Sequence, residues 1–184
     1  MNVFNNFGKN EDYTPICKLS NGQYLVNFDK KEQLQEEQIM QNSRLVGTGK
    51  LLPTGYSSWR YIVFDSKPSI VAIQDTIYNI INKEVSACIE DGLIWNGYNV
   101  HLSLENQMNY KNAFDLAITT SGESLPVTFK FAKNGHSEYY TFDNISELKA
   151  FYIAVNNHIN KCLENGWKKK DKFNKEEYML SNIL

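Results

Sequence analysis

Three of the four Asn-Gly pairs in this 184-residue chain constrain its fold more than any other feature, because Asn-Gly is the strongest short-range signal for a tight β-hairpin. They are Asn21-Gly22, Asn96-Gly97 and Asn134-Gly135, each between segments rich in β-branched or aromatic residues. The second pair predicts a two-residue type I′ turn. Hairpins of this kind join antiparallel strands without a crossover helix, so the pattern argues against a doubly wound nucleotide-binding fold.

Amphipathic helices are predicted around the second and third hairpins. Isoleucines recur at helical spacing from Ile70 to Ile89, after Pro68 at the opening position and before Gly92 as the terminating residue. Ser103 is expected to cap a helix over residues 104–118. Two hairpins are expected, one pairing strands 93–95 and 98–102 and one pairing strands 125–131 and 138–142 across a turn at 133–136. Asn144 and Glu147 are expected to form a capping box that begins the last helix, which Gly166 is expected to end. Residues 68–172 therefore predict an α+β fold in which antiparallel β-hairpins alternate with amphipathic helices, in the order helix, hairpin, helix, hairpin, helix.

The first 67 residues predict a smaller hairpin and helix region that attaches the chain to a neighbour. Strands are expected at 14–19, 23–28 and 56–64, and Asp29 stands where it would cap a helix over 30–46. The apolar stripe of that helix is thin, so it would pack weakly on its own domain or complete its burial on a partner. Residues 173–184 are expected to form a polar tail.

Composition argues against polyanionic and membrane partners. The formal net charge is −2 and the isoelectric point about 5.9, so no global basic surface would attract nucleic acid or an anionic membrane. The start of the chain lacks the pattern of a signal peptide, and the most apolar segment, residues 70–81, is interrupted by polar side chains. We therefore expect no nucleic acid and no membrane as partners, and favour contacts with proteins.

Cysteine and histidine positions predict neither a metal site nor a cofactor. Cys17, Cys88 and Cys162 lie far apart without a C-x-x-C motif, so they are expected to be reduced, buried thiols of a protein made in a cytoplasm. His158 is expected on the solvated face of the last helix and His136 in a solvated hairpin turn. No two histidines have the spacing with which a single element binds a metal.

Catalytic motifs are missing, so we expect the protein not to be an enzyme. The segment at Gly47–Lys50 lacks the spacing of a phosphate-binding loop, and neither G-x-S-x-G nor H-E-x-x-H occurs. His101, Ser103 and Glu105 are close in sequence, but a strand end and the next helical turn send such side chains outward, which favours caps and surface contacts. An enzyme acting on polysaccharide would need two carboxylates across a cleft, and the carboxylate pairs here are sequence neighbours that diverge on a helix.

Aromatic and basic segments are interpreted as structural. The aromatic residues of the third hairpin, from Phe129 to Phe142, are expected to build a core on one face, the alternative being a platform that stacks RNA bases. Residues 168–172 carry four lysines, which complement the dipole at a helix C-terminus better than they form a phosphate-binding patch.

The helix after Ser103 carries the candidate partner-contact residues. Asparagine and glutamine are poor helix formers unless they pack or hydrogen-bond, so their density here predicts a specific duty. They either tie this helix to the adjacent hairpins or face a partner subunit, and both readings stay open. The candidates are Glu105, Asn106, Gln107, Asn109, Tyr110 and Lys111, together with Trp167 near the end of the last helix.

Several short blocks in the second half of the chain resemble an uncharacterised domain family. The blocks are residues 102–111, 115–117, 125–131, 139–142 and 166–171. The family is common in tail-fibre-associated and other structural proteins of bacteriophages and prophages, including those of gut Bacteroidetes and their crAss-like phages. The resemblance covers residues 68–172 and implies a role in the virion or as a phage accessory protein, with no catalytic residues to carry over.

The sequence and the resemblance together lead to one expected function and one alternative. The expected function is a non-enzymatic structural or adaptor protein of a phage virion, associated with tail, fibre or head. It would be synthesised in the bacterial cytoplasm, form a homo-oligomer in the particle and contact other phage structural proteins. The alternative is a phage-encoded binding protein outside the virion, such as an inhibitor of a host defence protein, which would be a monomer with one tight partner.

Overall fold

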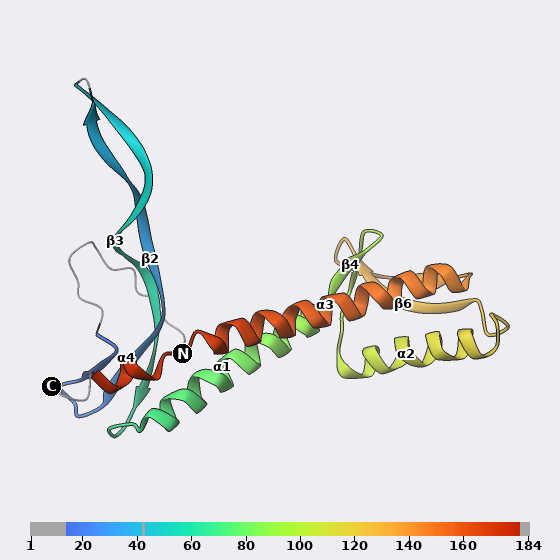
Figure 1. Ribbon diagram of the computed structural model, residues 1–184. Coiled ribbons are helices and arrows are strands. Elements are labelled where there is room, and N and C mark those ends of the chain that lie inside the picture. The colour runs from blue at the N-terminus through green and yellow to red at the C-terminus, as the bar shows by residue number, and fades with distance from the viewer. Residues whose placement is uncertain (1–13, 42, 181–184) are drawn as a thin grey trace. The chain divides into compact units, whose positions relative to one another are not determined.

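The computed structural model describes residues 14–41 and 43–180 and divides into two compact units (Figure 1). The first unit is Met1–Ile77 with Asn174–Leu184, and the second is Tyr78–Phe173. The division between the units falls inside helix α1 (Ile70–Asp91). The C-terminal segment belongs to the first unit, where residues expected to be a polar tail include helix α4 (Lys175–Leu180).

The first unit is built on an antiparallel sheet of strand order β1-β2-β3. Its strands are β1 (Ile16–Lys18), β2 (Tyr24–Gln41) and β3 (Arg44–Phe64). β1 and β2 pair across the turn that contains Gly22, which confirms the first predicted hairpin. The helix predicted over 30–46 is wrong, because these residues extend β2 and begin β3. The local signals for a helix are weak there, and pairing with residues farther along the chain overrides them.

The second unit combines three helices with an antiparallel sheet of strand order β4-β5-β6-β7, which confirms the α+β class. After α1, its elements are β4 (Leu93–Trp95), β5 (Tyr98–Val100), α2 (Leu104–Thr119), β6 (Val127–Lys133), β7 (His136–Phe142) and α3 (Ile145–Asp171). Each neighbouring pair of strands is antiparallel. β6 begins after Pro126, whose peptide bond with Leu125 is cis.

Both hairpins of this sheet turn through two residues with positive φ, as a type I′ turn requires. The φ angles are 47° at Asn96, 82° at Gly97, 51° at Asn134 and 79° at Gly135. His136 was expected inside the second turn, but it is the first residue of β7 and is exposed there. The turn is shorter than expected because Asn134 and Gly135 suffice to reverse the chain.

Side-chain caps begin α2 and α3, as the sequence predicts. Ser103 Oγ accepts a hydrogen bond from the Asn106 amide at 3.3 Å. Asn144 Oδ1 accepts one from the Glu147 amide at 2.9 Å. The Glu147 carboxylate in turn accepts a hydrogen bond from the Tyr140 hydroxyl at 2.6 Å and so connects α3 to β7. Burial, and then this bond, raise the pKa of Tyr140.

An aromatic core joins one face of this sheet to α2 and α3. Phe151 of α3 is completely buried, and its ring centroid lies 5.0 Å from that of Phe142, 5.1 Å from that of Tyr110 and 5.4 Å from that of Trp95. Burying such a side chain contributes about 3 kcal/mol. Tyr139, on the opposite face of β7, is 75% exposed. The predicted one-sided core of this hairpin is therefore confirmed.

Two glycines that were both predicted to end helices, Gly92 and Gly166, have different roles. Gly92 ends α1 with φ of 76°, as predicted, and a Cβ there would lie 1.8 Å from the Val100 carbonyl oxygen. Gly166, predicted to end the last helix, is instead a buried interior residue of α3, which continues to Asp171. A Cβ at Gly166 would lie 2.3 Å from Val85 Cγ2 of α1. The missing side chain thus permits close approach of two helices rather than termination of one.

Basic residues occupy the last turn of α3, where they complement the helix dipole as expected. Two of them also reach α1. Lys169 Nζ lies 2.7 Å from Glu84 Oε2, and Lys170 Nζ donates to Asn82 Oδ1 at 2.6 Å. Within residues 14–41 and 43–180, no helix combines the length and apolarity needed to cross a membrane.

Candidate functional site

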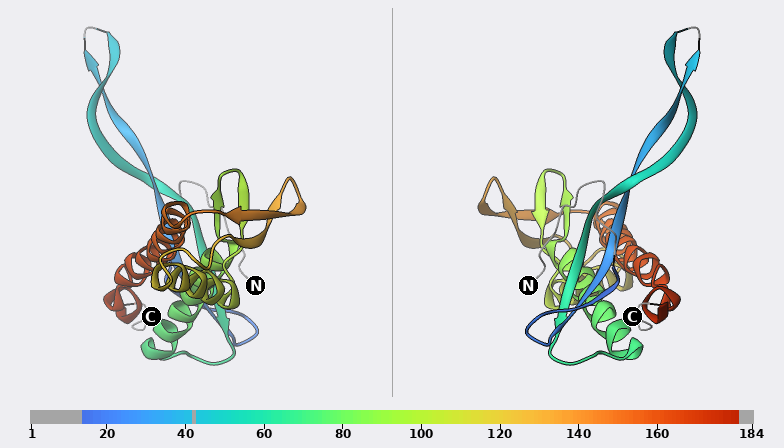
Figure 2. Two further views of the ribbon diagram at one scale, coloured as in Figure 1. Left: turned by 90° about the vertical axis from the view of Figure 1, so that its right-hand side faces the viewer. Right: turned by 90° about the vertical axis from the view of Figure 1, so that its left-hand side faces the viewer.

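The principal candidate site is the long two-stranded ribbon formed by residues 31–41 of β2 and 44–58 of β3, here called the arm (Figure 2). β1 pairs only with the start of β2, at Tyr24, Leu25 and Val26. In the part of the chain that the structure describes, no third strand pairs with the arm. Both of its outer edges therefore carry backbone groups that another chain can bond.

Among the side chains of the arm that the structure describes, six large apolar ones are exposed. They are Leu34 (54% exposed), Ile39 (50%), Met40 (70%), Leu45 (65%), Val46 (42%) and Leu51 (59%). Directly paired residues project from the same face of a ribbon and successive residues from opposite faces. Ile39 pairs with Val46, and Met40 pairs with Leu45. Near its tip the arm is therefore apolar on both faces, so a partner that covered one face alone would leave the other in water.

Irregular pairing and acidic side chains shape the middle of the arm. The register shifts at several places, including one between Glu36 and Gln38. Around that shift, Glu36 Oε1 accepts a hydrogen bond from the Gly49 amide at 2.7 Å, and Glu37 Oε2 accepts one from the Thr48 hydroxyl at 3.2 Å. Such bulges increase strand twist and reduce edge-to-edge aggregation. The segment Gly47–Lys50 is part of β3, where Gly49 adopts φ of 74°.

A buried cation lies near the base of the arm. Arg60 of β3 is 5% exposed, and its Nε lies 3.1 Å from Asp29 Oδ2. The guanidinium carbon also lies 4.7 Å from the centre of the Phe28 ring, in a cation–π contact. Asp29, predicted to cap a helix, instead adopts φ of 55° within β2, next to a register shift. Its short side chain tolerates this left-handed conformation.

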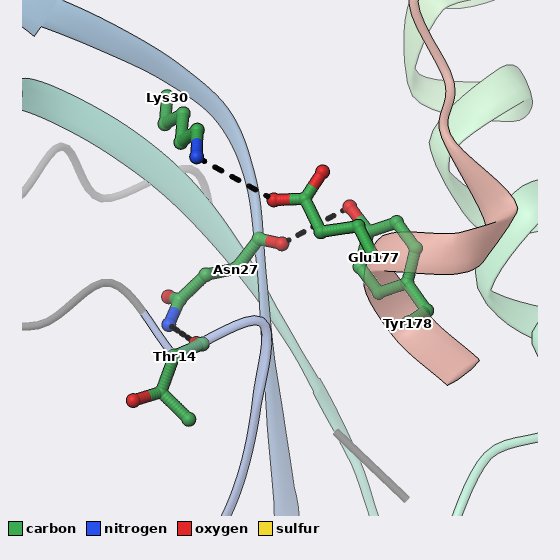
Figure 3. A network of polar contacts seen from close by, with 5 residues as sticks. All are labelled: Thr14, Asn27, Lys30, Glu177 and Tyr178. Atoms are coloured by element: carbon green, nitrogen blue, oxygen red, sulfur yellow. Dashed lines mark hydrogen bonds and ion pairs between the residues drawn. The ribbon is translucent and has the colours of Figure 1, made fainter. Parts of the chain in front are cut away.

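Helix α4 packs against the same part of β2 (Figure 3). The Tyr178 hydroxyl donates a hydrogen bond to the Asn27 carbonyl oxygen at 3.2 Å, and Tyr178 is 3% exposed. Lys30 Nζ lies 3.9 Å from Glu177 Oε1. On the other side of the strand, Asn27 Nδ2 donates to the Thr14 carbonyl oxygen at 2.6 Å. These contacts fix the strand from which the arm extends.

Most of the predicted partner-contact residues lie on α2, and two of the amides are engaged locally. Asn106 Nδ2 donates to the His101 carbonyl oxygen at 3.0 Å, and Gln107 Nε2 donates to the Leu102 carbonyl oxygen at 2.8 Å. These bonds tie α2 to the segment that precedes it. For Asn106 and Gln107 they support the interpretation that the amides hold the helix to its neighbours.

The other candidates divide between the surface and the core. Glu105, Asn109 and Lys111 are exposed on α2, and Trp167 is 56% exposed on α3. Lys111 forms an ion pair with Asp115 one turn later, which raises the pKa of the lysine. Tyr110 is only 3% exposed, because its ring packs among the core phenylalanines, and burial raises its pKa to about 12. Its ring therefore belongs to the core and is not a surface available to a partner.

A cluster of sulfur and imidazole side chains lies between α1 and α3. Cys88 and Cys162 form a disulfide with Cα atoms 6.0 Å apart, so the prediction that these cysteines are reduced and unpaired is wrong. His158, expected on the solvated face, is half-buried, and its Nε2 lies 3.6 Å from Cys162 Sγ and 2.9 Å from the Cys88 carbonyl oxygen. The i, i+4 spacing of His158 and Cys162 was a signal for this cluster, but sequence alone does not show that α1 supplies the third member.

No protein-family model matches the chain, and no curated protein or solved structure is significantly similar to it.

Proposed function

We propose that the chain is a non-enzymatic structural or adaptor protein of a bacteriophage particle, and that it assembles through protein–protein contacts made by the arm. The observation that carries this proposal is the exposure of apolar side chains on both faces of the arm, near Met40 and Ile39. A two-stranded ribbon without further packing is only marginally stable in water. A partner that surrounds the tip would stabilise the ribbon and remove its apolar surface from solvent.

The energetics of the arm favour assembly in several copies. The six exposed apolar side chains described above are 42% to 70% exposed, so complete burial would contribute about 1 kcal/mol per side chain. The total of about 6 kcal/mol is close to the lower end of the free-energy cost of bringing two proteins together. A single arm contact would therefore be weak. Repetition around a symmetry axis, where each subunit gives one arm and receives another, would make the assembly stable.

The phage assignment rests on the resemblance of residues 68–172 to the domain family of phage structural proteins. We propose that the helix, hairpin, helix, hairpin, helix order of this segment is the arrangement of that domain. In this proposal the protein is made in the bacterial cytoplasm and then enters the virion as a homo-oligomer. Its partners there are other phage structural proteins, whether in tail, fibre or head.

The test is quantitative mass spectrometry of particles purified from a producing culture, with the solution mass of the recombinant full chain measured alongside. The proposal predicts abundant peptides of this chain in intact particles, at a copy number that matches a symmetric position, and an oligomer in solution or on addition of particle proteins. Absence from particles, together with a monomer that binds one host protein, would refute the proposal. That result would establish the chain as a phage-encoded binding protein that acts outside the virion.

A further inference from the structure

Two sulfur atoms and one imidazole nitrogen converge where α1 meets α3. The Sγ atoms of Cys88 and Cys162 and a ring nitrogen of His158 all lie within 4.8 Å of one another. We propose that, when the disulfide is reduced, these three side chains form a binding site for Zn²⁺, with Cys88 Sγ, Cys162 Sγ and His158 Nε2 as ligands. This site is independent of the arm and of the proposed role in a phage particle.

The separation of the His158 and Cys162 donor atoms already suits a shared metal ion. Zinc–sulfur bonds of about 2.3 Å and zinc–nitrogen bonds of about 2.1 Å at a tetrahedral angle place the two donors about 3.6 Å apart. The observed distance from His158 Nε2 to Cys162 Sγ is 3.6 Å. His158 and Cys162 lie one turn apart on α3, so the helix itself holds this pair of ligands at the required spacing.

Cys88 completes the set from the facing helix. Two zinc-bound sulfur atoms lie about 3.8 Å apart at a tetrahedral angle, which is the contact distance of two sulfurs that are not bonded to each other. After reduction, the two sulfur atoms therefore need to move apart only to their ordinary non-bonded contact distance in order to bind one zinc ion. Cys162 is 3% exposed, whereas Cys88 is partly exposed, so a metal ion can approach the set from the Cys88 side.

The donor types favour zinc over harder cations. Thiolate and imidazole ligands suit Zn²⁺, whereas Mg²⁺ and Ca²⁺ prefer oxygen donors. Two thiolates would neutralise the charge of the ion, and the three protein ligands would leave a fourth position for water or an exogenous ligand.

The conversion balances in protons and electrons. A phosphine or dithiol reductant supplies two electrons, the sulfur–sulfur bond breaks, and two thiols form with two protons from water. Zn²⁺ then displaces both thiol protons. In the disulfide form, His158 Nε2 must carry the imidazole proton, because it donates to the Cys88 carbonyl oxygen at 2.9 Å. Metal binding moves that proton to Nδ1, and the zinc bond replaces this hydrogen bond.

The experiment is a titration of the full chain with Co²⁺, which reports thiolate ligation through charge-transfer bands and tetrahedral geometry through its visible spectrum. One sample of the protein is reduced with a phosphine, and a control sample of the same protein retains the disulfide. We expect one equivalent of Co²⁺ bound to the reduced protein, displacement of the cobalt by Zn²⁺, and no charge-transfer band in the oxidised protein. A reduced protein without such a band would overturn the proposal.

Matched variants assign the ligands. His158→Ala should weaken binding at least 10-fold, since loss of a supporting group outside the coordination sphere already costs about 10-fold to 100-fold. Cys88→Ser, at a partly exposed position that tolerates the change, should reduce the charge-transfer intensity. His136→Ala and Cys17→Ser remove an exposed histidine and the cysteine outside the disulfide, and should leave the titration unchanged. Binding that survives His158→Ala, or that Cys17→Ser removes, would show that the metal binds elsewhere.

Discussion

The contact between α1 and α3 at Gly166 allows a quantitative prediction. An alanine in a helix interior is favoured over glycine by about 1 kcal/mol, so Gly166→Ala would stabilise an isolated helix. In the folded protein, however, the new Cβ would lie 2.3 Å from Val85 Cγ2, which is far inside van der Waals contact. Relieving such a clash in a packed interior costs about 1–3 kcal/mol. We expect Gly166→Ala to lower the free energy of unfolding by about 1 kcal/mol.

A second substitution separates the clash from the change in helix propensity. Val85→Ala removes the methyl group that clashes, and the next neighbours of the new Cβ, Val85 Cβ at 3.7 Å and Ile81 Cγ2 at 3.8 Å, are at ordinary contact distance. In that background Gly166→Ala should stabilise the protein by about 1 kcal/mol. The two substitutions should therefore be coupled by about 2 kcal/mol, in the favourable direction.

The assay is urea unfolding of the four proteins of this cycle, followed by far-ultraviolet circular dichroism of the helices and by tryptophan fluorescence. Agreement of the two signals would establish that the unit carrying α1 and α3 unfolds as one. The reasoning is refuted if Gly166→Ala stabilises the protein that retains Val85, or if its effect is the same in both backgrounds. Either result would mean that α1 and α3 do not pack closely at Gly166.

Three further predictions concern single contacts. Burial raises the pKa of Tyr110 to about 12, above its unfolded value near 10, so the contribution of Tyr110 to stability is complete below pH 10 and is lost as the pH rises toward 12. The free energy of unfolding, measured across this range, should therefore depend less on pH in Tyr110→Phe than in the unsubstituted protein. Tyr178→Phe removes the hydrogen bond to the Asn27 carbonyl oxygen. Losing about 1 kcal/mol of local stability should accelerate amide hydrogen exchange in α4 about 5-fold. Unchanged exchange would mean that this bond does not hold the helix. Ser103→Ala removes the cap that accepts from the Asn106 amide and should lower stability by about 1 kcal/mol in urea unfolding, whereas Ser103→Asp should retain most of it.

Local chemistry made much of the second unit predictable. Asn96-Gly97 and Asn134-Gly135 form the two-residue turns because both residue types accept positive φ. Ser103 and Asn144 define helix starts because their side chains accept backbone hydrogen bonds. Gly166 shows the limit of such rules. The same residue type that ends α1 at Gly92 lies inside α3, and only the position of Val85 on another helix distinguishes the two cases.

The arm and the sulfur cluster depend on contacts between distant residues, which local patterns do not report. The Glu- and Gln-rich segment over 30–46 has residues compatible with a helix, yet it pairs along β3, and its apolar side chains remain exposed instead of forming a helical stripe. Cys88 and Cys162 are separated by 74 positions, and they meet only because α1 and α3 pack together. Of the predicted partner-contact residues, Tyr110 lies in the core, where its ring packs against those of Phe129 and Phe151.

The most direct test of the central claim is the number of copies of the chain per purified particle when its arm is altered. Met40→Lys with Leu45→Asp replaces an exposed cross-strand pair by opposite charges, which removes apolar surface near the tip while the pair can still attract across the ribbon. Ile94→Asp, at a 72% exposed position on β4, is the matched control. With tagged chains supplied during phage production and counted by mass spectrometry, incorporation of the arm variant should fall at least about 10-fold, the equivalent of 1.4 kcal/mol, while the control stays at the unsubstituted level. Equal incorporation of the arm variant and the unsubstituted chain would contradict assembly through the arm.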